Sequence, residues 1–177
     1  MELSDIQQKF ITHWGEMGTA WGVNRTVAQI HALLFIHGKP LNAETLADTL
    51  KVARSNVSTS LRELQSWGLV RSSQVLGDRR DYFETTSDVW ELFRVVVKGR
   101  KEREFTPTTQ MLQALCERPD FADEPPDAQD RLRATTELMD QLNRWSDEML
   151  RLSPGTLIKV LSLGASIQKF VRGGDKT

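Results

Sequence analysis

The chain has 177 residues, 39% of them hydrophobic and 27% charged, so it can bury a core and is not a disordered polypeptide. No apolar run approaches the roughly 20 residues that span a bilayer, and no basic segment followed by an apolar one opens the chain, so we expect a cytoplasmic protein. The single cysteine, Cys116, excludes an intrachain disulfide.

The N-terminal part of the chain has the period of α-helices. A helix is predicted over residues 4–22, with one apolar stripe formed by Ile6, Phe10, Trp14, Met17 and Trp21. A second helix is predicted over residues 25–37, and Gly38 and Pro40 end it.

Two shorter helices follow, separated by the brief segment KVA. Asn42 is a candidate N-cap for the first, which ends near Leu50. The second is predicted from Arg54 to Trp67, and Gly68 is its left-handed C-terminal residue. A short turn of this kind sets two helices at a steep angle, as in a helix-turn-helix.

Beyond Gly68 the pattern changes to that of a β-hairpin. The runs LVRSSQVL and DYFETT flank the charged segment GDRR, so we predict two strands with Arg79 and Arg80 at the tip. The helical period then returns, with further helices expected from residue 88, from Thr106 and Pro107, over residues 127–152 and over residues 153–171.

The helix predicted from Arg54 to Trp67 has two unlike faces. At about 100° per residue, its apolar side chains fall on one side and would pack inward. The opposite side and its flank carry short polar side chains and one arginine: Ser55, Asn56, Ser58, Thr59 and Arg62. These residue types pair with base edges and phosphates, so the pattern indicates a recognition helix for the major groove of DNA.

Positive charge is concentrated around this helix. Between residues 51 and 80, six cationic side chains stand against two acidic ones, a local charge of +4 in a chain whose total is −1. We expect phosphate contacts from Lys51, Arg54, Arg71, Arg79 and Arg80, and binding that weakens steeply with salt. Charge alone would equally fit an ordinary solvated surface.

The stretch LADTLKVARSNVSTSLRELQSWGLV, followed by GDRRDYFETT, resembles the winged helix of the MarR superfamily. The later stretch DVWELFRVVVKGRKEREFTPT resembles its GbsR-type branch, and the whole resemblance covers residues 1–117. It implies a homodimeric transcription regulator, usually a repressor and often released by a small ligand. Ala53 stands where relatives commonly carry a Ser or Thr N-cap, which should cost about 1 kcal/mol.

The expected fold is mainly α with a small β-wing. It comprises a winged helix-turn-helix DNA-binding domain over residues 25–87, between an N-terminal dimerisation helix (1–24) and a helical linker and dimerisation region (88–177). The expected dimer interface consists of Ile6, Phe10, Met17, Leu138, Leu142, Trp145, Met149, Leu157 and Leu161. Two-fold symmetry would place two recognition helices roughly 34 Å apart on a pseudo-palindromic operator. Packing of the same stripes within one chain is the alternative.

Other interpretations of the pattern stay open. A winged helix can also serve as a protein–protein interaction module, or as a ligand sensor that does not bind DNA. The five tryptophans could in part line a pocket for a cationic ligand, although core and interface positions also explain their helical spacing. Cys116 lies on an apolar helix face, which favours an inert thiol over a redox sensor. The histidines lack metal-ligand spacing and no catalytic motif is found, so we expect neither an enzyme nor a cofactor.

Overall fold

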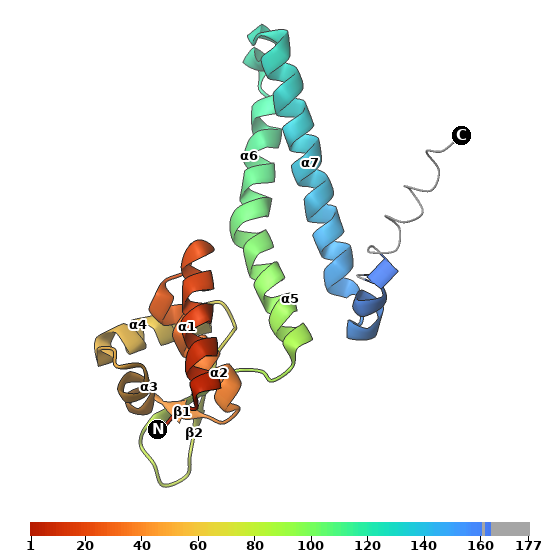
Figure 1. Ribbon diagram of the computed structural model, residues 1–177. Coiled ribbons are helices and arrows are strands. Elements are labelled where there is room, and N and C mark those ends of the chain that lie inside the picture. The colour runs from red at the N-terminus through yellow and green to blue at the C-terminus, as the bar shows by residue number, and fades with distance from the viewer. Residues whose placement is uncertain (161, 164–177) are drawn as a thin grey trace. The chain divides into compact units, whose positions relative to one another are not determined.

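The computed structural model describes residues 1–160 and 162–163 (Figure 1). Helices dominate it, and one small antiparallel sheet lies among the first of them. The chain divides into two compact units, Met1–Val96 and Val97–Thr177. The first helix therefore lies in the same unit as the helix-turn-helix, and the dimerisation role expected for residues 1–24 stays a prediction.

The first two helices begin and end as their capping residues dictate. α1 (Asp5–Ala20) opens with a capping box in which Ser4 Oγ accepts from the backbone N–H of Gln7. α2 (Arg25–His37) is capped by Asn24, whose side-chain oxygen accepts a hydrogen bond from the backbone N–H of Thr26. The helix ends at Gly38, which has the left-handed conformation.

The packing of α1 on α2 depends on small residues. Gly15 and Gly18 are buried, and a Cβ on Gly18 would stand 2.5 Å from the Cβ of Ala28. Ile11, which is 3% exposed, is the large apolar residue that α1 contributes to the core. Of the predicted apolar stripe, Phe10 packs against this core, whereas Ile6 is 79% exposed.

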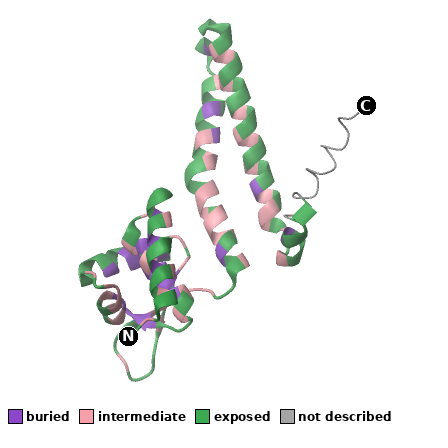
Figure 2. Ribbon diagram, viewed as in Figure 1, coloured by how far each residue is buried: buried purple, intermediate pink, exposed green. Residues whose placement is uncertain are grey.

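The core of the first unit surrounds α2. Ile30 and Leu33 on α2 are fully buried, and so are residues of the helix-turn-helix helices, namely Leu46 and Val57. Figure 2 shows the buried residues gathered in this unit, whereas the long helices of the second unit are mostly half-buried or exposed. Because the core covers the apolar face of α4, only its polar face can contact a ligand.

One ionisable side chain lies in this core. His31 is 5% exposed, and its imidazole stacks against Phe35. The Thr85 hydroxyl donates to the carbonyl of Leu69 at 2.7 Å, so its oxygen accepts from His31 Nε2, 3.4 Å away. Burial lowers the pKa of His31 from 6.5 to about 4, so the residue is neutral in the folded protein at neutral pH.

The helix-turn-helix has the predicted bounds. α3 (Ala43–Leu50) is capped by Asn42, whose Oδ1 accepts from the Thr45 N–H at 2.9 Å. α4 (Arg54–Ser66) follows Ala53, which has N-cap backbone angles but makes no side-chain cap hydrogen bond. Both capping expectations for these helices are confirmed.

The sheet has three strands, one more than the expected hairpin. β2 (Arg71–Gln74) and β3 (Asp81–Glu84) form the hairpin, and the two-residue strand β1 (Leu41–Asn42) pairs antiparallel with β3 on its other edge. The register places Phe83 opposite Leu41 on one side and Ser72 on the other. This pairing ties the base of the hairpin to the start of α3.

Long helices joined by irregular turns follow the sheet, and the boundary between the two units falls within the first of them. α5 (Val89–Arg100) passes through a π-helix, η1 (Lys101–Phe105), directly into α6 (Thr106–Cys116). α6 begins at Thr106 as predicted, but Thr106 has α-helical backbone angles and so does not act as an N-cap. Pro107 has no N–H to donate to the preceding turn, and a local change of helical period accommodates that loss.

A 3-10 turn, η2 (Pro119–Asp123), connects α6 to α7 (Pro126–Arg151). Residues 154–160 are helical as predicted, while the rest of the expected last helix, with Leu161, lies outside the described residues apart from residues 162–163. Leu157 is 2% exposed in the single chain, and its expected place in an interface between two copies stays a prediction.

The contact between α6 and α7 is polar along much of its length. Thr109, which is 4% exposed, accepts a hydrogen bond from Asn143 Nδ2, and Ser146 is also buried. Lys101 forms an ion pair with Asp147 at 3.1 Å near one end. Three large apolar side chains of α7 remain exposed, namely Leu138, Leu142 and Trp145.

Candidate nucleic-acid interface

The turn before α4 changes the direction of the chain sharply. Lys51 has a left-handed φ of 56°, and the N–H groups of Lys51 and Val52 both donate to the carbonyl of Ala47. Ala53 is then extended, and α4 begins. A non-glycine residue is rarely left-handed, so the three-residue turn positions α4 with little freedom.

The two predicted faces of α4 are confirmed by burial. Val57, Leu61 and Leu64 are at most 2% exposed and belong to the core. The side chains expected to read DNA are all exposed, namely Ser55, Asn56, Ser58, Thr59 and Arg62. Arg62 lies along its own helix, with Nε 3.4 Å from the Ser58 carbonyl and a terminal nitrogen 3.4 Å from the Thr59 hydroxyl.

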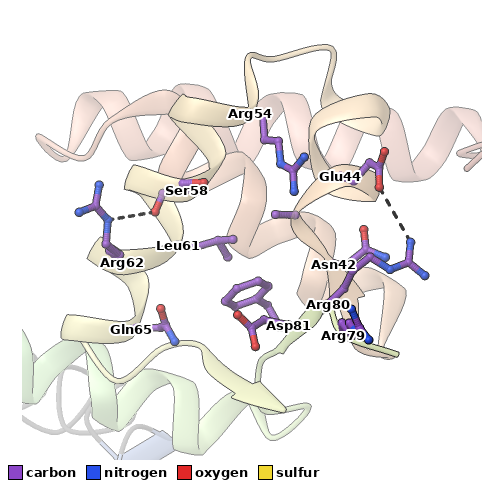
Figure 3. Close-up of a pocket in the computed structure, with 12 residues that line it drawn as sticks. Asn42, Glu44, Arg54, Ser58, Leu61, Arg62, Gln65, Arg79, Arg80 and Asp81 are labelled. Carbon is purple, nitrogen blue, oxygen red and sulfur yellow. Dashed lines mark hydrogen bonds and ion pairs between the residues drawn. The ribbon is translucent and has the colours of Figure 1, made fainter. Parts of the chain in front are cut away.

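A concavity of about 430 Å³ lies between α4 and the arm of the hairpin that returns into β3. Figure 3 shows Arg54, Ser58 and Arg62 on one side of it, with Arg79 and Arg80 across from them. Four arginines line it against two acidic residues, Glu44 and Asp81. The predicted cations of the helix and of the hairpin thus face a common hollow, although they are far apart in sequence.

Arg80 is held by neighbouring groups of the hairpin. Its guanidinium donates to both carboxylate oxygens of Asp78, at 2.6 Å and 3.0 Å, and to the Tyr82 hydroxyl at 3.3 Å. Glu44 at the start of α3 lies 3.9 Å away, and Figure 3 draws this contact. The hydrogen bond from Arg80 lowers the pKa of Asp78 well below its usual range, and Asp78 in turn raises the pKa of Arg80.

The other predicted cations differ in their pairing. Arg71 donates to Glu84 across the hairpin at 3.0 Å, so its charge is partly neutralised. Lys51, Arg54 and Arg79 are exposed and have no ion pair among the residues that the structure describes. These three side chains are therefore the cations best placed to accept a phosphate.

The tip of the hairpin differs from the prediction. The tight turn spans Val75 to Asp78, closed by a hydrogen bond from the Asp78 N–H to the Val75 carbonyl at 3.0 Å, with Gly77 at a φ of 87°. The apex is therefore Leu76 and Gly77. Arg79 follows the turn, and the ion pairs of Arg80 hold its side chain back toward α3.

Two amide side chains that line the concavity were not predicted as site residues. Gln65 lines it one turn after Leu61, and Asn42 lines it beside the start of α3. The helical spacing of Gln65 from Ser58 and Arg62 is a signal that could have identified it. Asn42 could not be identified, because its place depends on β1 pairing with β3.

Three further features bear on other kinds of site. No group of three or more potential metal ligands occurs among residues 1–160 and 162–163. In the same part of the chain, no helix is long and apolar enough to cross a bilayer. Cys116 is half-buried on α6, with its sulfur 3.6 Å from the Thr136 hydroxyl.

Comparison with known proteins identifies relatives of this segment. Residues 21–81 match the model of the MarR family. The putative HTH-type transcriptional regulator YvaV of Bacillus subtilis (strain 168) is 21% identical over 148 residues, which are 82% of each chain.

The fold of the chain resembles that of a solved structure. The crystal structure of a transcriptional regulator superposes with a TM-score of 0.64 at 20% identity, covering 82% of this chain and 95% of that chain. S. aureus MepR in complex with DNA aligns with a TM-score of 0.38 at 16% identity, over 77% of this chain and 92% of that chain. That similarity is too low to transfer its DNA contacts.

Proposed function

We infer that this chain, whose residues 21–81 are a winged helix of the MarR family, is a DNA-binding transcriptional regulator. The observation that carries this conclusion is the basic concavity, where the polar face of α4 and the returning arm of the hairpin meet. A groove of this kind accepts a phosphate backbone while the neighbouring helix enters the major groove.

We assign separate roles to the side chains of the interface. Ser58, Thr59 and Arg62, which are exposed on α4, would contact base edges, where a guanidinium can pair with guanine. Arg54 and Arg79 contact phosphates on either side of the concavity, which gives affinity without sequence choice. This division predicts different responses to salt for the two groups.

The test uses duplexes selected by the full chain from a random pool. Arg62→Ala should cost about 1–3 kcal/mol on the selected duplex and little on random DNA. Arg79→Ala should weaken both and reduce the slope of log K against log salt by about one for each phosphate that the variant no longer neutralises. Arg131→Ala, which removes an exposed arginine from α7, is the matched control and should bind like the wild type. Wild-type levels of binding by Arg62→Ala would refute the assigned reading face, and failure to select any duplex would favour a protein–protein module.

We propose that the regulator is a homodimer whose interface includes α7. Leu138, Leu142 and Trp145 are 55%, 37% and 57% exposed, and they recur at alternating spacings of four and three residues. The polar contact between α6 and α7 leaves this stripe uncovered. A second copy of the same helix would bury it. On α1, Ile6 is a further exposed apolar residue available to the same partner.

A charge on the stripe tests this interface. Leu138→Glu should convert a dimer into a monomer in sedimentation equilibrium at micromolar concentration, with unchanged helical circular dichroism. Gln141→Glu adds the same charge at an exposed position on α7 and should leave the dimer intact. A monomeric wild type, or a dimeric Leu138→Glu variant, would contradict the proposal.

The finer assignment is a repressor of the GbsR-type branch released by a small ligand. It is supported by the resemblance of residues 88–108 to that branch. Deleting the gene in its host should raise transcription from the promoter that carries the selected duplex. Reduced transcription on deletion would instead identify an activator.

A further inference from the structure

The apex of the hairpin carries an apolar side chain with no cover. Leu76 is fully exposed, at 105% of its reference accessible area, and the neighbouring Val75 is 47% exposed. Figure 1 shows the loop between β2 and β3 extending away from the helices of the first unit. Among the exposed apolar residues of the described chain, Leu76 has the largest exposed fraction.

The geometry of the turn holds Leu76 outward. It occupies the second position of the turn closed between Val75 and Asp78, and Gly77 supplies the positive φ that this turn type requires. Directly behind the turn, Asp78 is fixed by Arg80 and by the Tyr82 hydroxyl at 2.8 Å. These hydrogen bonds fix the residues at the base of the turn, which keeps Leu76 from folding back onto the domain.

The surroundings of this apex indicate the chemistry of its partner. Arg79 follows the turn and lines the basic concavity that α4 also lines. A partner that contacts both the concavity and Leu76 must present anionic groups to the arginines and an apolar surface to the leucine. The minor groove of DNA offers both, because phosphates border it while sugars and base-pair edges form its walls and floor.

We propose that Leu76 is an apolar wedge that enters the minor groove next to the major-groove site read by α4. This inference rests on the proposed function. Apolar side chains inserted at base steps partly unstack them, and pyrimidine–purine steps open at the lowest energetic cost. Leu76 therefore adds a preference for deformable steps at positions outside the reach of Arg62, with one wedge from each copy of a dimer.

The experiment compares Leu76→Ala and Leu76→Met with the wild type on the selected duplex. Leu76→Ala should bind about tenfold more weakly, the effect of leaving a leucine surface uncovered. Its salt slope should match the wild type, because a leucine neutralises no phosphate. Leu76→Met keeps an apolar side chain of similar size and should retain most of the affinity. Ile36→Ala, which shortens an exposed aliphatic residue on α2, is the matched control and should bind normally.

Modified duplexes locate the contact. Replacing adenine by 2,6-diaminopurine adds an amino group in the minor groove and leaves the major-groove edge unchanged. At the base pairs beneath the wing, this change should weaken the wild type several-fold and leave Leu76→Ala unaffected. A 2-aminopurine at the same step should brighten on binding of the wild type and less with Leu76→Ala, since unstacking relieves its quenching.

The outcomes separate this inference from the proposed function. Equal affinities of Leu76→Ala and wild type, or equal sensitivity of both to diaminopurine, would overturn the wedge while leaving DNA binding intact. Loss of binding to anionic vesicles in Leu76→Ala, with DNA affinity unchanged, would instead assign the apex to a membrane surface. A wild type that selects no duplex would overturn the proposed function and the wedge together.

Discussion

Lowering the pH from 8 to 5 should destabilise the first unit through His31. Burial lowers the pKa of His31 to about 4 in the folded protein, whereas the unfolded chain restores the ordinary value of 6.5. Between these values the unfolded state binds more protons than the folded state. The stabilising contribution is therefore complete above about pH 6.5 and is lost as the pH falls toward 4.

The two pKa values set the size of the effect. At 1.36 kcal/mol per pH unit, the complete loss amounts to about 3 kcal/mol, and about 2 kcal/mol of it is lost by pH 5. Asp78 and Asp120 have lowered pKa values, so their contributions are lost only as the pH falls below their ordinary value of 3.8. They lie outside this window.

Urea unfolding followed by tryptophan fluorescence at pH 8, 7, 6 and 5 measures the effect. Trp14 on α1 and the residues that follow the last turns of α1 and α4, Trp21 and Trp67, report on the unit that contains His31. His31→Gln removes the titration and retains an N–H donor near Thr85, so its stability should change less with pH than that of the wild type. An equal loss of stability in both proteins between pH 7 and pH 5 would refute the role of His31.

Further predictions concern local packing and caps, each measured by the same urea unfolding. Gly18→Ala should destabilise the first unit by about 1–3 kcal/mol, although alanine favours helices, because its Cβ would overlap Ala28. Gly155→Ala meets no atom within 4 Å and should not destabilise. Asn42→Ala removes the cap of α3 and should cost about 1 kcal/mol, whereas Ala53→Ser supplies the missing cap of α4 and should add about 1 kcal/mol. A stabilising Gly18→Ala or Asn42→Ala, or a destabilising Gly155→Ala or Ala53→Ser, would contradict these predictions.

Much of the first unit followed from local patterns in the sequence. The bounds of α2, α3 and α4 were predicted to within a residue from apolar spacing and from Gly38, Asn42 and Gly68. The exposed polar face of α4 followed as well, because a helix with one apolar side has only that side to bury. Neither inference needed knowledge of any contact between distant segments.

Tertiary structure decided the features that depend on such contacts. The two-residue strand β1 has no period of its own, so its pairing with β3 became visible only in the sheet. The face of α1 that packs on α2 could not be identified from apolar spacing, because that spacing does not register the close helix crossing that Gly18 permits.

The sequence by itself determined that positive charge and small polar groups gather around a helix-turn-helix and a hairpin. It treated Arg79 and Arg80 as equivalent. Only the folded chain distinguishes them, because Asp78, Tyr82 and Glu44 surround the guanidinium of Arg80 while Leu76 takes the apex. The physical reason is that residue type fixes which bonds a side chain can make, whereas its neighbours in space determine which of them it makes.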